Sequence, residues 1–164
     1  MRKLFQDGTR IMTVVVQRIK NGNVVVDGEV VAECGVGLYL LVGITHDDTE
    51  EDARLLCDKI VKMRIFSDEN DKMNLSVKDV DGGIMAVPNF TLYASYRKGN
   101  RPDYQNSAVP AVAKPLFDYF VGRLKEQHEN VSSGVFGAHM MINVTCDGPV
   151  TIPMYSDVLK QPKR

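Results

Sequence analysis

The chain has 164 residues, of which 44% are hydrophobic and 25% are charged, and its formal net charge is −1. This is the composition of one folded domain with a substantial core, which argues against two independent domains. No apolar run approaches the roughly 20 residues of a membrane-spanning helix. Most nucleic-acid-binding domains carry an excess of basic residues, which this near-neutral chain lacks, so any contact with RNA has to be local.

The first eleven residues differ from those that follow. They contain three basic residues and Asp7, and they lack the apolar stretch of a secretory signal. We expect residues 1–11 to form an N-terminal extension without a targeting role, with disorder and a short organelle presequence as open alternatives. The folded domain is expected to span residues 12–155. Residues 156–164 are expected to form a basic tail that frays from residue 160 onward.

Four β-strands are expected early in the chain, at residues 13–19, 24–26, 29–34 and 38–44. Asp27-Gly28 between two β-branched runs is typical of a hairpin turn. The run 38–44 is apolar without polar alternation, which favours a strand covered on both faces.

Two helices are expected after these strands. Thr49, with Asp52 three residues later, resembles an N-terminal capping box and begins an amphipathic helix of about four turns. Its apolar face consists of Ala53, Leu56, Cys57 and Ile60. The polar segment 67–72 is expected to be an exposed connection. The second helix spans residues 110–127, and Pro115 must lie near its first turn or kink it.

Three further segments have the composition of strands, at residues 84–94, 139–146 and 150–154. The predicted order is therefore four strands, a helix, a strand, a helix and two strands. This order predicts a single α+β domain in which two main helices pack on a mixed, strongly curved, barrel-like sheet.

Searches for common chemical motifs find little. The sequence has no phosphate-binding Gly-Lys-Ser/Thr loop, no nucleotide-binding glycine fingerprint and no metal-ligand spacing, so we expect neither a cofactor nor a metal. A lone imidazole without a nucleophile partner is weak evidence for catalysis, so surface or packing roles are expected for His46, His128 and His139.

The cysteines are odd in number and far apart in the sequence, at Cys34, Cys57 and Cys146. None has the paired spacing of a zinc or redox site. They are interpreted as buried thiols of a reducing compartment, and a cytoplasmic location is expected.

Two segments are unusual for ordinary strands and turns. Residues 87–93, Val-Pro-Asn-Phe-Thr-Leu-Tyr, form an apparent strand with a proline, which fits only at a sheet edge, a bulge or a strand start. The plain interpretation is an edge strand. Residues 147–151, Asp-Gly-Pro-Val-Thr, have the composition of a simple turn between two strands.

These two segments belong to a series of motifs that resembles the D-aminoacyl-tRNA deacylase family. The resemblance runs in order from about Met12 to Met154, and six motifs in sequence order are a far more specific signal than any one of them. The motifs are Val16-Gln17-Arg18, Lys72-Met73-Asn74-Leu75-Ser76, Phe90-Thr91-Leu92-Tyr93, Lys98-Gly99-Asn100-Arg101-Pro102, Gly134-Val135-Phe136-Gly137-Ala138 and Asp147-Gly148-Pro149-Val150-Thr151.

The resemblance implies an enzyme of translation quality control. It would hydrolyse the ester of D-aminoacyl-tRNA, and of glycyl-tRNA mischarged on tRNA(Ala), and release the free amino acid and the tRNA. It implies a homodimer whose active sites lie at the interface and receive the Gly-Pro motif of the partner subunit. The Gly148–Pro149 bond would be cis and braced by Arg18, and its backbone carbonyls would exclude an L side chain.

The resemblance also implies roles for the residues around this motif. Backbone N–H groups at Phe90 and Thr91 are the expected oxyanion donors. Thr91 is expected to shape the pocket rather than to attack, because no base accompanies it, and the 2′-hydroxyl of the terminal adenosine would orient or activate a water. The substrate pocket is expected to consist of Gln17, Pro88, Asn89, Phe136, Gly137, Ala138 and Met140.

A cluster of basic residues overlaps the Lys98–Pro102 motif. It consists of Arg97, Lys98 and Arg101, interleaved with the aromatic residues Tyr96 and Tyr104. These basic residues are expected to hold the acceptor-stem phosphates. A solvated loop is the equally weighted alternative for this cluster.

The chain departs from the family pattern at two places. Pro88-Asn89 stand where the family usually has Ser-Gln, and Cys146 stands where it usually has Asn. Pro88 removes a backbone N–H and Asn89 is one methylene shorter than Gln, so either could shift an oxyanion donor. Two alternatives to the deacylase therefore stay open: a catalytically silent tRNA- or nucleic-acid-binding homologue, and a module that edits a wrong L-amino acid.

Overall fold

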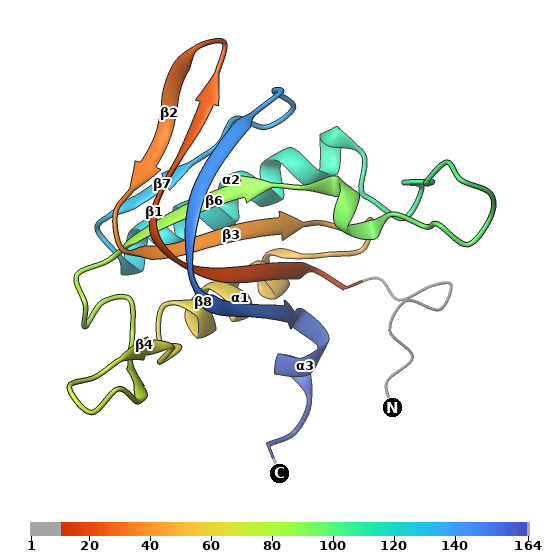
Figure 1. The fold of residues 1–164 in the computed structure, drawn as a ribbon. Coiled ribbons are helices and arrows are strands. Elements are labelled where there is room, and N and C mark those ends of the chain that lie inside the picture. The colour runs from red at the N-terminus through yellow and green to blue at the C-terminus, as the bar shows by residue number, and fades with distance from the viewer. Residues whose placement is uncertain (1–10, 164) are drawn as a thin grey trace.

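The computed structural model describes residues 11–163 and has the α+β architecture expected from the sequence (Figure 1). One sheet has the strand order β2-β1-β3-β6-β7, and β8 pairs with the other edge of β1. The sheet strands are β1 (Thr13–Val26), β2 (Glu29–Cys34), β3 (Gly37–Gly43), β6 (Gly83–Pro88), β7 (Val131–Ser133) and β8 (Met141–Tyr155). The short β4 (Phe66–Ser67) and β5 (Met73–Leu75) form a separate hairpin.

β1 is one long strand, whereas the sequence predicted two. Its first half pairs with β3, from Thr13 to Ile19, and its second half pairs with β2, from Gly22 to Val26. The polar residues between the two predicted strands do not interrupt the strand, because ladder hydrogen bonds come from the backbone and need no apolar side chain.

β8 is likewise continuous where two strands, 139–146 and 150–154, were expected. It begins at Met141, so His139 lies outside it. β8 is antiparallel to β1 along nearly its whole length. Among the described strands, none pairs with the other edge of β8.

The centre of the sheet is parallel. β6 is parallel to β3 on one side and to β7 on the other. β3 is almost fully buried, which confirms the prediction for residues 38–44. The sheet nearly closes on itself, because the hydroxyl of Ser132 on β7 donates to the carbonyl of Glu33 on β2 at 3.3 Å. The barrel-like curvature is therefore confirmed.

The helices α1 (Glu50–Ile60) and α2 (Pro110–Gln127) cover one face of the sheet (Figure 1). α1 begins as predicted: the backbone N–H and the hydroxyl of Thr49 both donate to Asp52 Oδ2, each at 2.9 Å. It has 11 residues, one turn fewer than expected. α2 has the predicted bounds, and Pro115 lies exposed inside it. No helix among the described residues is long and apolar enough to cross a membrane.

The C-terminal segment is more ordered than expected. Residues 156–160 form the short helix α3 (Ser156–Lys160), and Lys160 Nζ lies 2.7 Å from Asp52 Oδ1. The carboxylate of Asp52 is nearly buried, so this ion pair ties the helix to the N-terminus of α1. The sequence does not reveal this long-range partner of Lys160, and fraying stays a prediction for the residues after it. The predicted N-terminal extension lies outside the described residues up to residue 10.

Two apolar clusters lie on opposite faces of the sheet. The larger one fills the space between the sheet and the helices. The smaller one lies on the other face and is centred on Ile19, Tyr39, Met85 and Val87. Half-buried side chains pack against this smaller cluster without a helix to cover them, and they include Leu41, Met140, Ile142 and Val144.

Candidate functional site

The strand β6 ends at Pro88, and the chain then forms the 3₁₀ helix η1 (Phe90–Tyr93). The prediction of a strand over residues 84–94 was therefore wrong beyond Pro88. So was the interpretation of an edge strand, because β6 lies between β3 and β7. Proline has no N–H to donate, and in β6 the backbone groups of even-numbered residues face β7, as the bond from the Ile84 N–H to the Asn130 carbonyl shows. The pairing with β7 ends at Ser133, opposite Ala86, so no ladder bond is lost at Pro88.

Asn89 determines how the chain turns after β6. The N–H of Asn89 donates to the Val42 carbonyl at 2.8 Å, and its side-chain oxygen accepts from the Thr91 N–H at 3.1 Å and from the Thr91 hydroxyl. Asn89 is thus the N-cap of η1, a role that suits this short amide. The Thr91 N–H is engaged by this cap. The Phe90 N–H is at the first helical position, where it has no acceptor within the helix.

The segment after β7 lies beside the end of β6. The Gly134 N–H donates to the Ala86 carbonyl at 2.9 Å, which continues the parallel ladder. A Cβ at Gly134 would come within 2.6 Å of Met140 Sδ, so the Met140 side chain would have to shift to accept it. Phe136 packs against Phe117 of α2, with ring centroids 6.4 Å apart. We call residues 88–93 and 134–140 together the β6 end.

A hollow of about 430 Å³ lies between the β6 end and α2. Phe117, Val121 and Phe136 give it apolar walls, and Lys114 and Lys125 lie among its lining residues. Of the predicted substrate-pocket residues, Pro88, Asn89, Phe136, Gly137, Ala138 and Met140 all belong to the β6 end.

The Asp-Gly-Pro-Val segment leaves the ladder between β1 and β8. Ile19 pairs with Cys146 and Gln17 pairs with Thr151, so residues 147–150 stand opposite the single residue Arg18. We call residues 147–150 the Gly-Pro bulge. The plain turn expected from composition is instead a bulge within a long strand. The Gly148–Pro149 peptide bond is cis, as the resemblance implies.

Arg18 holds the Gly-Pro bulge. Its Nε donates to the Asp147 carbonyl at 3.0 Å and lies 3.3 Å from Asp147 Oδ2, and its Nη1 donates to the Ile65 carbonyl at 2.8 Å. The side chain is only 12% exposed, so these charged hydrogen bonds are shielded from water. Gly148 has φ +151°, and a Cβ there would lie 2.3 Å from Val150 N.

Gln17 belongs to the same neighbourhood as the bulge. Its side-chain oxygen accepts from the thiol of Cys146 at 3.2 Å. Cys146 is exposed and Cys34 half-buried, so the expectation of three buried thiols holds only for Cys57. Burial raises the pKa of Cys57 and of Cys34. Burial, with the nearby Cys146, raises the pKa of Tyr39, the cross-strand partner of Gln17, to about 12.

The β6 end and the Gly-Pro bulge lie at opposite ends of the sheet in one chain. Pro88 pairs with Val42 of β3, whereas Arg18 pairs with Leu38. Since strands rise about 3.3 Å per residue, these positions are separated by about 13 Å along β3, before the sideways distance from β6 to β8 is added. The structure therefore brings the predicted site residues together as two groups rather than one.

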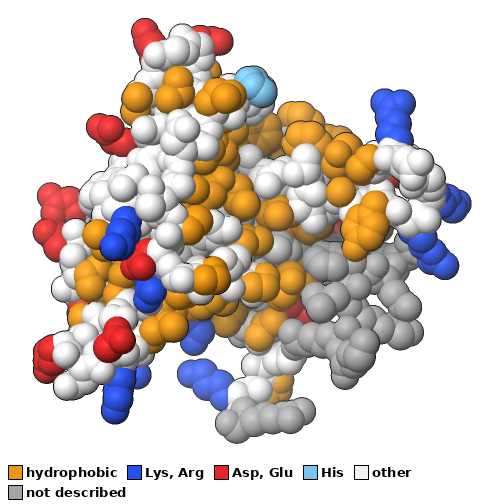
Figure 2. Space-filling view, in the orientation of Figure 1, with side chains coloured by type: hydrophobic (Ala, Val, Ile, Leu, Met, Phe, Trp, Pro, Cys, Tyr) orange, Lys and Arg blue, Asp and Glu red, His pale blue; other side chains and the backbone are white. Residues whose placement is uncertain are grey.

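The basic cluster follows η1 in a protruding loop (Figures 1 and 2). Arg97, Lys98 and Arg101 are all exposed. The loop is joined to the β6 end by an edge-to-face contact between Phe90 and Tyr104, with ring centroids 5.2 Å apart. Phe90 itself is 58% exposed.

Several contacts around these groups were not predicted from the sequence. Asp147 and the Ile65 carbonyl hold Arg18, and His46 Nε2 lies 3.1 Å from the Gln105 carbonyl at the base of the basic loop. His128 Nε2 lies 2.6 Å from the Gly82 carbonyl, in line with a packing role. Asp147 could have been suspected from its place beside Gly-Pro, but no sequence signal marks a backbone acceptor such as Ile65.

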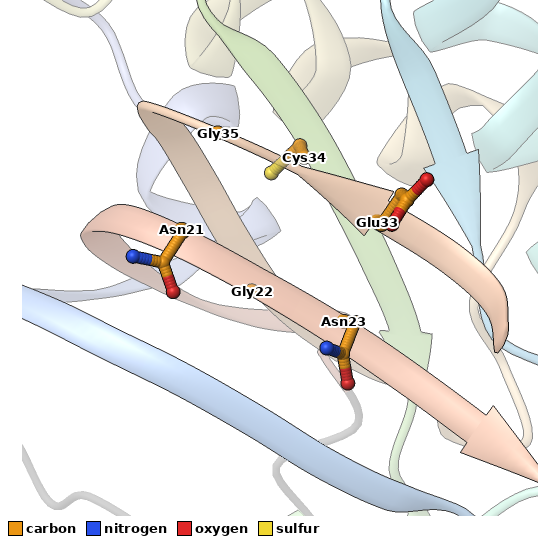
Figure 3. Close-up of a pocket in the computed structure, with 6 residues that line it drawn as sticks. All are labelled: Asn21, Gly22, Asn23, Glu33, Cys34 and Gly35. Carbon is orange, nitrogen blue, oxygen red and sulfur yellow. The ribbon is translucent and has the colours of Figure 1, made fainter.

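A second hollow, of about 420 Å³, is unrelated to either group. It lies where β1 and β2 meet, and Figure 3 shows Asn21 and Asn23 extending from the same side of β1 near Cys34. It contains no pair of acidic or basic groups that would do chemistry together. Within residues 11–163, no three His, Cys, Asp or Glu side chains are grouped so that they could hold a metal ion.

Known proteins are similar to this chain over most of its length. The family model described as D-Tyr-tRNA(Tyr) deacylase matches residues 15–155. A curated protein of Caldicellulosiruptor saccharolyticus named D-aminoacyl-tRNA deacylase is 50% identical over 141 residues, which cover 86% of this chain and 95% of that protein. A solved structure named c-Myc DNA Unwinding Element Binding Protein is 34% identical, with a TM-score of 0.81, covering 87% of this chain and 97% of the other.

A second solved structure supports the fold alone. It is described as a probable eukaryotic D-amino acid tRNA deacylase and is 18% identical, with a TM-score of 0.76. The match covers 88% of this chain and 99% of that one.

Proposed function

The chain belongs to the D-Tyr-tRNA(Tyr) deacylase family, and from this premise we propose how its two groups of site residues cooperate. It is a hydrolase, a D-aminoacyl-tRNA deacylase. We propose that it acts as a homodimer in which the β6 end of one subunit and the Gly-Pro bulge of the other form each active site.

The observation that carries this proposal is the separation of the two groups. The register puts them about 13 Å apart along β3, which is too far for both to contact one ester carbon within one chain. A second copy related by a twofold axis would present its bulge to the first copy's β6 end, and the reverse contact would form equally.

The face of the sheet without helices supports the same proposal. Leu41, Met140, Ile142 and Val144 are half-buried there, and the edge of β8 has no partner among the described strands. Figure 2 shows a band of hydrophobic side chains along this face. Monomers seldom expose such a band beside an open strand edge, and a second copy would cover both.

We assign chirality to the Gly-Pro bulge. Gly148 has no Cβ, so its backbone can approach the α-carbon of a bound aminoacyl group closely. The carbonyls of Gly148 and Pro149 would then occupy the space of an L side chain, while a D side chain points away. Glycine has no side chain to exclude, so glycyl-tRNA is also a substrate. This makes the enzyme a chirality proofreader with a broad range of side chains.

We assign the chemistry to the β6 end and to the RNA. The hydroxyl of Thr91 donates to Asn89, and no His, Lys or carboxylate among its hydrogen-bond partners could take its proton. A water therefore attacks the ester carbonyl, assisted by the 2′-hydroxyl of the terminal adenosine. The Phe90 N–H donates to the oxyanion, and the 3′-oxygen leaves with a proton.

Two experiments test these assignments. Release rates from D-tyrosyl-, L-tyrosyl- and glycyl-tRNA are compared, and we expect hydrolysis of the first and third only. A tRNA ending in 2′-deoxyadenosine should bind but not react. Equal rates for D- and L-tyrosyl-tRNA would support the L-editing alternative. No hydrolysis at all would support a silent nucleic-acid-binding homologue, which the name of one solved relative makes worth testing.

The shared site is tested by mixing two strongly impaired variants, Phe90→Pro and Gly148→Ala. Random exchange makes about half of the dimers mixed, each with one complete site, so about a quarter of the wild-type activity should return. Sites contained within one chain would recover nothing. A monomer at micromolar concentration in analytical ultracentrifugation would contradict the dimer directly.

A further inference from the structure

The basic loop has a base held by hydrogen bonds, and we call residues 96–102 its tip. Ser95 and Asp103 exchange two backbone hydrogen bonds, at 2.7 and 2.8 Å, which close the loop around residues 96–102. His46 and Gln105 hold the segment just after it, at 3.1 Å. Gly99 has φ +64°, which turns the chain at the tip. The tip therefore projects as a defined structure from the end of η1.

The tip carries positive charge that no acidic residue within it balances. Residues 96–102 read Tyr-Arg-Lys-Gly-Asn-Arg-Pro, with three basic residues and no acidic one, in a chain whose formal net charge is −1. No carboxylate of the described residues forms an ion pair with Arg97, Lys98 or Arg101. A concentrated, unpaired positive charge suits a polyanionic partner.

The tip also carries an aromatic ring that packing does not explain. Tyr96 is 82% exposed, more than any other large hydrophobic side chain of the described residues. Phosphates alone would need only the basic residues. An exposed ring among Arg and Lys is the combination that binds single-stranded nucleic acid, where the ring stacks on a base and the cations follow the backbone.

The loop lies next to the chemistry. Tyr104, just past the Ser95–Asp103 closure, packs edge-on against Phe90 at 5.2 Å. Aromatic groups therefore extend from the β6 end to the base of the loop whose tip holds Tyr96. A strand whose last nucleotide is at the β6 end would pass this loop with its preceding nucleotides.

We propose that residues 96–102 bind the unpaired nucleotides that precede the terminal adenosine of tRNA, with Tyr96 stacked on a base. Arg97, Lys98 and Arg101 contact the phosphates of this single strand. The inference rests on the proposed function, because it takes the ester at the β6 end as the fixed end of the strand. The loop is then a second recognition element, and it distinguishes unpaired from paired nucleotides.

Comparing two substrates tests the inference. D-tyrosyl-adenosine contains the ester and the last nucleoside but no preceding nucleotides, whereas D-tyrosyl-tRNA contains both. Tyr96→Ala should lower kcat/KM for D-tyrosyl-tRNA about 5- to 150-fold, the range expected for one stacked base. It should leave hydrolysis of D-tyrosyl-adenosine unchanged. Tyr96→Phe keeps the ring and should stay within about twofold of wild type on both substrates.

The charge is tested separately with a matched lysine. Lys98→Ala should reduce the slope of log kcat/KM against log salt concentration by about 0.7 with D-tyrosyl-tRNA, as expected for one lost single-strand phosphate contact. Lys62→Ala also removes an exposed charge, just after α1, and should leave the slope unchanged.

The possible outcomes distinguish failure of the proposed function from failure of the proposed stacking by Tyr96. Wild-type protein that hydrolyses neither substrate overturns the proposed function itself. If the wild type hydrolyses D-tyrosyl-tRNA and the Tyr96→Ala variant does so at the same rate, the stacking proposal is overturned. An equal loss on both substrates also overturns it, because the loop would then act by shaping the β6 end rather than by holding nucleotides.

Discussion

The β6 end and the Gly-Pro bulge are positioned in different ways. The β6 end continues the backbone ladder on both sides: Asn89 bonds to Val42 of β3, and Gly134 bonds to Ala86 of β6. The bulge leaves the ladder, and the side chain of Arg18 holds it. The β6 end is thus held by backbone hydrogen bonds on two sides, and the bulge by one side chain. In the proposed mechanism, the chemistry therefore has more than one support, whereas the chirality depends on Arg18 alone.

Removing the oxyanion donor should have the largest effect. Phe90→Pro deletes the N–H at the first position of η1, where proline fits the backbone. We expect kcat to fall about 10²- to 10³-fold, as for loss of one oxyanion donor. Phe90→Ala keeps the N–H and loses only the ring, so it should lose far less. Single-turnover hydrolysis of D-tyrosyl-tRNA measures both, and equal losses would show that the ring matters rather than the donor.

Crowding the bulge should have the next largest effect. Gly148→Ala places a Cβ 2.3 Å from Val150 N at φ +151°, so the bulge must move. We expect kcat/KM for D-tyrosyl-tRNA to fall about 100-fold, equivalent to roughly 2.7 kcal/mol. Gly122→Ala is the control, because a Cβ on this exposed α2 glycine meets no atom within 4 Å. A Gly148→Ala enzyme with wild-type kinetics would remove the bulge from the site.

Releasing the bulge without crowding it should change selectivity more than rate. Arg18→Ala removes charged hydrogen bonds to Asp147 and Ile65, each of a kind that contributes about 1.5–3 kcal/mol. We expect the ratio of D- to L-tyrosyl-tRNA hydrolysis to fall at least tenfold. Arg18→Lys should recover part of the ratio, because lysine keeps the charge but cannot make both contacts. Arg54→Ala, which loses only a surface pair with Asp58, should keep the full ratio.

The same contrast explains what the sequence could predict. The buried run of β3 and the apolar face of α1 follow from the local sequence. The run was predicted within one residue of its observed bounds, and the four residues predicted for the face of α1 are all buried, although the helix is one turn shorter than expected. The 3₁₀ helix at Phe90 was missed, because its residues favour strands and the cap comes from Asn89. The bulge was interpreted as a turn, because only pairing with β1 reveals that both flanks belong to one strand. The separation of the two site groups depends on register across β1, β3 and β6, which no single segment encodes.

The smallest effect is expected at Thr91, where the redundancy of the β6 end can be tested. Its N–H donates to Asn89 regardless of the side chain, so Thr91→Ala keeps this backbone bond and loses only the second bond, from the hydroxyl. One neutral hydrogen bond on an exposed residue contributes about 0.5–1.5 kcal/mol at most, so kcat/KM should fall no more than about tenfold. A nucleophile would behave differently, because its removal abolishes the covalent route altogether. An inactive Thr91→Ala protein that is folded and dimeric, or an acyl group trapped on Thr91 and found by mass spectrometry, would assign the attack to this residue. The RNA hydroxyl would then have no place in the mechanism, and the β6 end would depend on one side chain as the bulge does.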